Sequence, residues 1–231
     1  YTYHLAKELI RRGDQAVIVT SNVQRLPSYE KMDGIPVYRF PCINLLDGRF
    51  PVLWPGGDFR KIHRTLMKKH FDKVIVNTRF YPHSLYGVLF GRRQRAKTIV
   101  IDHGSSHLTV HNPFWDTVGG WYEHLFTGIL KLLCKDYYGV SRASIQWLRH
   151  FHIQAKGALY NAIDLDEIQR RLAHPVRNFR EEYGIPDQAD VITFTGRLLA
   201  EKGLLPLVQA FKKVRSQYPD TYLCIAGDGD L

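Results

Sequence analysis

Two cations follow a glycine in residues 194–203, which read FTGRLLAEKG. The preceding residues 190–195 are rich in β-branched and apolar side chains and predict a strand, and a helix is predicted from about residue 203 to 218. Gly196 lets the backbone turn at the end of the strand, and Arg197 and Lys202 then stand beside the positive end of the helix. This arrangement suits a phosphate or diphosphate. On the motif alone, a turn with two solvated side chains is the simpler interpretation.

A second glycine motif follows the strand predicted for residues 221–226, where Gly227 and Gly229 flank Asp228. Loops of this kind bring backbone close to phosphates. A single G-x-G is weak evidence, however, because a plain turn explains it equally well.

His103 is the third candidate for chemistry. It follows the strand predicted for residues 97–102 and enters the loop GSSH, so we expect it to project into a cleft between two domains. The alternative is a structural loop histidine. His103, His107 and His111 recur every four residues as helical metal ligands do, but Gly104 and the two serines favour a loop. Since no H-E-x-x-H or comparable set accompanies them, we predict no metal site.

Short apolar strands and helix-length segments alternate along the chain. Such alternation indicates crossover units and a mostly parallel sheet covered on both faces, and hence an α/β fold. The predicted strands are residues 15–20, 36–40, 73–77, 97–102, 137–140 and 155–160. The predicted helices are residues 1–13, 58–69, 83–93, 116–135 and 142–150.

The alternation stops at residues 161–187, where two polar, Arg-rich helices (164–172 and 175–183) are predicted, and it restarts at residue 190. We therefore predict two domains, residues 1–175 and 176–231. Two strands and one helix are too few to form a sheet of their own, so we expect the second domain to continue beyond residue 231.

Several ordered motifs resemble the retaining glycosyltransferases of the group 1 family, also called family 4, which have the GT-B fold of two Rossmann-like domains. TGRLLAEKGLLPLVQAF (residues 195–211) is similar to the second-domain signature, and YLCIAGDG (222–229) to its strand and glycine loop. In the first domain, YHLAKELIRRGDQAVIVT (3–20), GVSR (139–142) and LYNAID (159–164) look like the first helix and second strand, a strand end and the turn into the linker. Ala162 replaces a glycine that the family prefers, which suggests a differently built turn.

The resemblance implies a role for each candidate. Arg197 and Lys202 would stabilise the diphosphate that leaves when a sugar is transferred from a nucleotide donor, because negative charge grows on it as the glycosidic bond stretches. Gly196, Gly227 and Gly229 would lie near the nucleotide, and His103 near the donor sugar. The family generally works without a metal, so we expect no cofactor other than the nucleotide-diphosphate sugar, which is a substrate.

The resemblance also implies elements that this sequence lacks. The family's first strand with its glycine-rich loop would precede Tyr1, and its acidic E-x7-E segment would follow Leu231. We therefore expect no turnover from these 231 residues alone.

Charge is distributed unevenly. Residues 1–175 hold 25 Lys and Arg against 14 Asp and Glu, whereas residues 176–231 hold 7 against 8. An anionic partner for the first part is one explanation, and a solvated basic surface is the other. We expect a cytoplasmic enzyme, peripheral at the inner face of the membrane, that acts on a glycan or lipid-linked acceptor. For the aromatic segment 121–133 we prefer a helix that simply covers the sheet.

Other classes fit less well. A basic nucleic-acid-binding module would explain the charge, but no nucleic-acid-binding motif is present, so we predict no nucleic-acid partner. Another GT-B-like enzyme, such as a sugar-nucleotide epimerase or a phosphorylase, is the remaining alternative. Cys42, Cys134 and Cys224 are odd in number and form no C-x-x-C pair, which argues against a disulfide framework and a cysteine zinc site.

Overall fold

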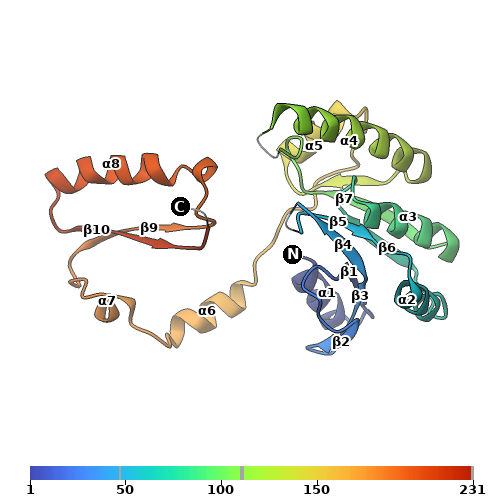
Figure 1. Cartoon of the computed structure of the whole chain (residues 1–231). Helices are drawn as coiled ribbons and strands as arrows, with labels where there is room; N and C mark the ends of the chain where they lie inside the picture. The colour runs from blue at the N-terminus through green and yellow to red at the C-terminus, as the bar shows by residue number, and fades with distance from the viewer. Residues whose placement is uncertain (47, 110–111, 230–231) are drawn as a thin grey trace. The chain divides into compact units, whose positions relative to one another are not determined.

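The computed structural model describes residues 1–46, 48–109 and 112–229. The chain forms two compact units, Tyr1–Ala162 and Ile163–Leu231 (Figure 1). The boundary thus falls before the two polar helices, which the predicted division at residue 175 assigned partly to the first domain. That division into functional domains stays a prediction.

In the first unit, five consecutive strands follow the first helix, and helices and strands alternate from residue 57 onward. Its helices are α1 (Thr2–Arg11), α2 (Gly57–Met67), α3 (Pro82–Gln94), α4 (Pro113–Leu133) and α5 (Arg142–His150). Its strands are β1 (Ile18–Ser21), β2 (Tyr29–Met32), β3 (Ile35–Phe40), β4 (Cys42–Leu45), β5 (Phe50–Leu53), β6 (Lys73–Asn77), β7 (Lys97–Asp102) and β8 (Tyr137–Gly139).

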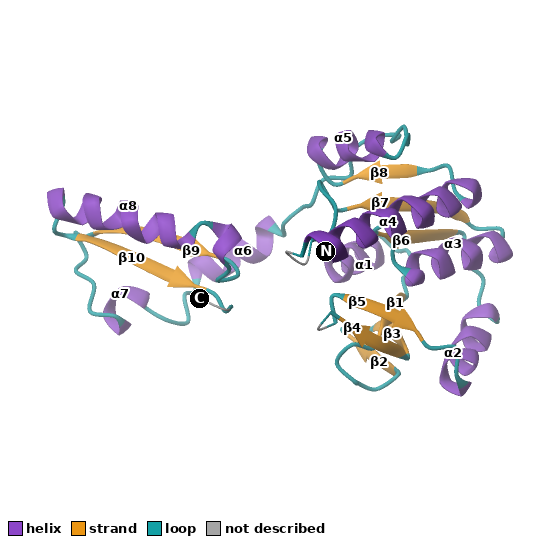
Figure 2. Cartoon of the chain, turned by 45° about the horizontal axis from the view of Figure 1, so that its top comes forward, coloured by secondary structure: helices purple, strands orange, loops and turns teal. Residues whose placement is uncertain are grey.

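Three sheets of described residues make up this unit. In the first, of order β1-β3-β2, β1 runs parallel to β3 and β2 antiparallel to it. β4 and β5 form an antiparallel pair. β6, β7 and β8 form a parallel sheet (Figure 2). In its register, Val76 pairs with Val100 and Val100 with Tyr137. The mixed α/β class is confirmed, but the sheet structure is less uniformly parallel than predicted.

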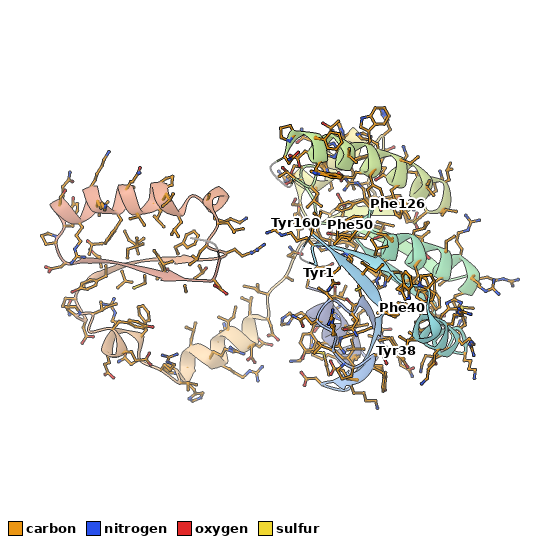
Figure 3. All side chains as sticks on the ribbon, viewed as in Figure 1. Tyr1, Tyr38, Phe40, Phe50, Phe126 and Tyr160 are labelled. Carbon is orange, nitrogen blue, oxygen red and sulfur yellow. The ribbon has the colours of Figure 1, made fainter. Side chains whose placement is uncertain are left out.

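Apolar side chains from the parallel strands pack against three helices. Val76, Val100 and Tyr137 share one face of the β6-β7-β8 sheet, because they occupy paired positions, and Val88 of α3, Leu130 of α4 and Leu148 of α5 complete this core. A second cluster forms around Tyr38 and Phe40 of β3, which Figure 3 labels, together with Ile62 and Leu66 of α2. Both clusters hold the strand ends in fixed positions.

Helix α4 packs against the rest of the unit through only one narrow face. Glu123, Thr127 and Leu130 are buried along that narrow face. The opposite face is apolar and exposed, so the expectation that residues 121–133 merely cover the sheet is wrong for this face. Its residues, spaced three or four apart, are 41% to 78% exposed: Phe114, Val118, Trp121, Leu125, Ile129 and Leu132.

The second unit contains α6 (Leu165–Ala173), α7 (Phe179–Glu182), β9 (Asp190–Thr195), the 3-10 helix η1 (Ala200–Lys202), α8 (Leu204–Gln217) and β10 (Thr221–Ala226). β9 and β10 run parallel, with Thr195 paired to Ala226 where both strands end. Among the described residues of both units, no helix is long and apolar enough to cross a membrane.

Two predicted elements are wrong. Residues 155–160 form no strand: they run beside β8 with hydrogen bonds from Lys156 N to Tyr137 O and Leu159 N to Gly139 O, but only Ala158 makes a β-bridge. The helix predicted for residues 175–183 is limited to α7, because the Asn178 side chain caps its start by accepting from Arg180 N. The antiparallel strands β2, β4 and β5 were not predicted.

Candidate functional site

The ends of β9 and β10 form an open cleft of about 650 Å³, lined by Gly196, Arg197, Gly227, Asp228 and Gly229. The two loops after these strands are joined by hydrogen bonds from Gly196 N to Ala226 O (3.1 Å) and from Leu198 N to Asp228 O (2.9 Å). The structure therefore brings the two glycine motifs predicted from sequence together at the carboxyl ends of parallel strands, where open α/β sheets bind ligands.

The close packing of the two loops explains why positions 227 and 229 are glycines. A Cβ at position 227 would lie 1.8 Å from Gly196 O, and a Cβ at position 229 would lie 2.3 Å from Leu198 O. Gly196 itself has φ +154°, which side chains disfavour. The G-x-G pattern thus lets one loop lie directly on the other, and this contact shapes the cleft.

Arg197 and Lys202 are both exposed, and no hydrogen bond or ion pair joins either side chain to another residue in the described part of the chain. Arg197 lines the cleft. Lys202 ends η1, directly before Gly203, the N-cap of α8, and it is not among the residues that line the cleft. Arg197 thus places a guanidinium at the cleft, and the anion-binding roles of Arg197 and Lys202 both stay predictions.

His103 follows β7 in the first unit, as predicted. Its Nε2 lies 3.0 Å from Asn77 Oδ1, and the Asn77 amide in turn donates to Thr2 Oγ1, which fixes its orientation. Neutral His103 therefore donates from Nε2 and keeps Nδ1 as an acceptor. The Tyr1 ring packs edge-on at 5.0 Å, and partial burial lowers the pKa of His103. This shift favours the neutral form of the histidine.

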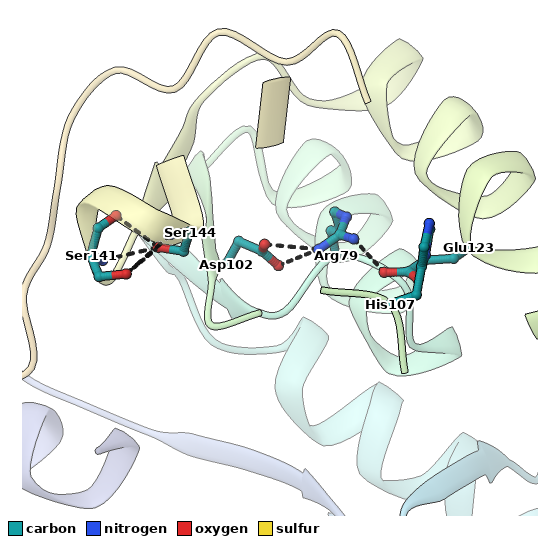
Figure 4. A network of polar contacts seen from close by, with 6 residues as sticks. All are labelled: Arg79, Asp102, His107, Glu123, Ser141 and Ser144. Carbon is teal, nitrogen blue, oxygen red and sulfur yellow. Dashed lines mark hydrogen bonds and ion pairs between the residues drawn. The ribbon is translucent and has the colours of Figure 1, made fainter. Parts of the chain in front are cut away.

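Next to His103 lies a buried network that the sequence did not predict. Arg79, directly beyond β6, donates from Nη1 to both oxygens of Asp102 at 2.8 Å and from Nη2 to Glu123 of α4 (Figure 4). Arg79 and Asp102 are fully buried, and Glu123 is 3% exposed. The second oxygen of Glu123 contacts His107 Nδ1. These pairs tie the ends of β6 and β7 to α4.

Electrostatics in this network are unbalanced. Two carboxylates face one guanidinium, and burial raises the pKa of Asp102 although Arg79 opposes the shift. The Arg79 guanidinium also lies 4.0 Å from the centre of the Phe151 ring, and its Nε has no hydrogen-bond partner among the described residues. Because Asp102 immediately precedes His103, the network positions the backbone that carries the predicted site histidine.

The GVSR motif has a local structural cause. Ser141 is the N-cap of α5: its Oγ accepts from Ser144 N, and Ser144 Oγ accepts from Ser141 N, which completes a capping box (Figure 4). A Cβ at Gly139 would lie 2.5 Å from Ser144 Oγ. The glycine therefore lets α5 begin directly on the end of β8.

The four-residue histidine pattern does not form a helix. Residues 103–109 are a loop, as predicted, and His111 lies outside the described residues. His107 instead faces His124 and His150. Neither of these two, nor Arg79 or Glu123, was a candidate in the sequence, because nothing in their local spacing links them.

Comparison with known proteins agrees with the geometry. The profile "Glycosyltransferase Family 4" matches residues 1–167, and "Glycosyl transferases group 1" matches residues 175–231. An uncharacterised glycosyltransferase of Methanocaldococcus jannaschii is 23% identical over 222 residues, which are 91% of this chain and 53% of that protein. The chain thus spans about half the length of this relative.

Two shorter matches involve further transferases. The lipopolysaccharide 1,2-N-acetylglucosaminetransferase of Salmonella typhimurium is 36% identical over 55 residues, which cover 24% of this chain and 14% of that protein. A second uncharacterised glycosyltransferase of Methanocaldococcus jannaschii is 35% identical over 74 residues, 32% of this chain and 19% of that protein. Since the family profile matches well over half of the residues, the chain belongs to glycosyltransferase family 4.

Proposed function

We propose that the protein transfers a sugar from a nucleotide-diphosphate donor to a glycan or lipid-linked acceptor with retention of configuration. The observation that carries this proposal is the cleft at the ends of β9 and β10, which Gly196, Gly227 and Gly229 line and where Arg197 has no partner among the described residues. Membership of family 4 supports the transferase chemistry.

The proposed chemistry is electrostatic. As the bond between sugar and diphosphate stretches, negative charge accumulates on the leaving phosphate oxygens, and a fixed cation that meets this charge lowers the barrier. Arg197 is the first such cation and Lys202 the second. His103, neutral and donating to Asn77, contributes its free Nδ1 as an acceptor for a hydroxyl of the donor sugar.

Binding tests this proposal directly, and we infer that residues 1–231 bind a donor without turning it over. Thermal shift and calorimetry with UDP, GDP and ADP sugars should identify one nucleotide that raises the melting temperature. Arg197→Ala should abolish the shift, and in any form of the protein that transfers sugar it should lower kcat by about 100- to 1000-fold. As a control, Lys212→Ala removes an exposed cation from α8 and should change neither the shift in melting temperature nor kcat. Equal binding by both variants would contradict the role of Arg197.

We further infer that the exposed face of α4 attaches the first unit to an anionic membrane that carries the acceptor. Six apolar side chains lie on this face, and the residues that sit between them on the same face are not charged. The first unit also holds 23 Lys and Arg against 11 Asp and Glu, so an anionic leaflet attracts it.

Co-sedimentation with vesicles separates the contribution of the apolar face of α4 from that of the positive charge of the first unit. Wild-type protein should bind vesicles that contain phosphatidylglycerol better than neutral vesicles, and the double variant Trp121→Ser, Leu132→Ser should lose most of this binding. Leu172→Ser, which changes an equally exposed leucine on α6, serves as the control. If the double variant bound like wild type, α4 would not be the attachment surface.

A further inference from the structure

Three histidines of the first unit that are far apart in the sequence lie close together in the structure. His107 lies in the loop after β7, His124 lies on α4, and His150 is the last residue of α5. One ring nitrogen from each lies within 4.8 Å of the other two, and His124 Nε2 and His150 Nε2 are 3.1 Å apart. Two ligands of a tetrahedral zinc ion, with bonds of about 2.0–2.1 Å, are about 3.3 Å apart, so this pair already has nearly the required separation.

His107 has the orientation of a metal ligand with outer support. Its Nδ1 contacts Glu123, so Nε2 remains as the nitrogen that can bind an ion, and Glu123 is itself held by Arg79 (Figure 4). A histidine whose second nitrogen is bound to a carboxylate is the usual arrangement at zinc sites, because the carboxylate fixes the tautomer and makes the imidazole a better ligand.

The surroundings hold the other rings and leave the cluster accessible. Trp147 stacks on His150 with ring centres 4.7 Å apart and planes 7° apart, and Phe151 packs against His124 at 4.8 Å. His124 and His150 are exposed and the His107 side chain is 33% exposed, so an ion can enter from solvent. Behind the cluster, two buried carboxylates share one guanidinium, and a cation at His107 would supply the missing positive charge.

We propose that His107, His124 and His150 bind one divalent transition-metal ion, preferably Zn²⁺, through one nitrogen each, with water in the fourth position. Three imidazoles are a donor set that suits zinc and its neighbours and not Mg²⁺ or Ca²⁺. The ion joins the loop that begins at His103 to α4 and α5. Its role in this position is to fix that loop. The proposal departs from the prediction of no metal site, which rested on the spacing of His103, His107 and His111, whereas the expectation that sugar transfer needs no metal is separate from it.

Metal binding by tag-free protein tests the proposal. After treatment with a chelator, the protein should bind one equivalent of Zn²⁺ and show a raised melting temperature. Co²⁺ should give the intense visible absorption of a tetrahedral site. His124→Gln and His150→Gln change exposed side chains and should fold, yet each should weaken Zn²⁺ binding at least about tenfold and remove the Co²⁺ bands.

A matched control lies close by. His152 is exposed, belongs to the same turn and is not part of the cluster, so His152→Gln should bind Zn²⁺ as wild type does. Glu123→Gln, which keeps all three ligands, should weaken binding by about 10- to 100-fold. If His124→Gln and His150→Gln bound Zn²⁺ as wild type does, or if wild type bound no stoichiometric Zn²⁺, the cluster would be a hydrogen-bonded group of imidazoles and the proposal would be overturned.

Discussion

The imidazole of His83 shows how one buried residue makes stability depend on pH. Its Nδ1 lies 3.0 Å from Ser21 Oγ, and the rings of Phe40 and Tyr86 lie beside it. Burial lowers the pKa of His83 from 6.5 to about 4. Between these two values the unfolded chain binds a proton that the folded chain does not, so the free energy of unfolding falls as the pH falls, by at most about 3 kcal/mol.

Urea unfolding between about pH 7 and pH 5 measures this effect. His83→Gln should make the pH dependence shallower, because glutamine does not titrate. The exposed His70, whose partner is the equally exposed Asp72, provides the control, and His70→Gln should leave the slope nearly unchanged. An identical slope for wild type and His83→Gln would mean that His83 is protonated in the folded state as easily as in the unfolded one.

Gly227 tests the packing of the two strand-end loops. Its substitution by alanine places a Cβ 1.8 Å from Gly196 O, which the backbone must move to relieve, so Gly227→Ala should destabilise the second unit by about 1–3 kcal/mol. Circular dichroism should detect this loss, whereas fluorescence should not change, because all four tryptophans lie in the first unit.

The opposite result is expected for Gly128→Ala. Gly128 lies within α4 with no atom within 4 Å of an added Cβ, so alanine should stabilise the helix by about 0.5–1 kcal/mol. If Gly227→Ala were as stable as wild type, the loops would not pack as the structure shows.

At the scale of elements, strands with a continuous apolar run were predictable. β6, β7, β9 and β10 have the predicted bounds, because each contains a run of apolar and β-branched residues that stands out in the sequence. β2 and β4 are only four residues long, and polar residues interrupt their apolar ones, so neither gives the longer apolar run by which the other strands were predicted. β2 is defined instead by its pairing with β3, which sequence spacing does not show.

The residues of the candidate site also divide into those with a local signal in the sequence and those without one. Gly196, Arg197 and the G-x-G at residues 227–229 follow strands directly, so topology alone brings them together. Arg79, Glu123 and His107 are joined only by the packing of α4 against the ends of β6 and β7. A buried ion pair between distant segments has no local signal, and it therefore emerges only from the structure.

Arg79 joins the two sides of that contact by ion pairs with Asp102 of β7 and Glu123 of α4. Arg79→Met removes the cation and leaves Asp102 and Glu123 buried and uncompensated, so it should destabilise the first unit by about 3–5 kcal/mol. Tryptophan fluorescence during urea unfolding measures the loss, since Trp147 lies beside Arg79.

A second substitution tests whether the uncompensated carboxylates cause this loss of stability. Adding Asp102→Asn to Arg79→Met removes one of the two buried charges and should recover part of the lost stability. The exposed Arg12, paired with Glu8 on α1, gives the control, and Arg12→Met should cost less than about 1 kcal/mol. If Arg79→Met cost no more than Arg12→Met, the network would not stabilise the fold.

At the scale of the whole chain, the two units differ in charge. The first holds 23 Lys and Arg against 11 Asp and Glu, and the second holds 9 against 11. The positive unit also carries the exposed apolar face of α4, whereas the other carries the cleft that Arg197 lines. The proposed attachment to an anionic surface and the proposed donor site therefore belong to different units.

The two units should also differ in stability. The sheet of the second unit has two strands, and Ile192 and Ile225 on it are 37% and 40% exposed, whereas Val100 and Ile101 of β7 are almost fully buried. A pair of strands with one helix is only marginally stable. Amide hydrogen exchange in residues 1–231 should therefore be faster in β9 and β10 than in β6 and β7.

Donor binding should reverse part of this difference. A nucleotide sugar that binds the folded cleft stabilises it by RT ln(1 + [L]/Kd), which is about 2.7 kcal/mol at one hundred times Kd, so exchange should slow in β9, β10 and their loops but not in β6 and β7. Arg197→Ala should lose this protection while its exchange without ligand stays the same. Equal protection of both sheets without ligand would contradict the stability argument, whereas protection confined to the first unit would place the donor elsewhere.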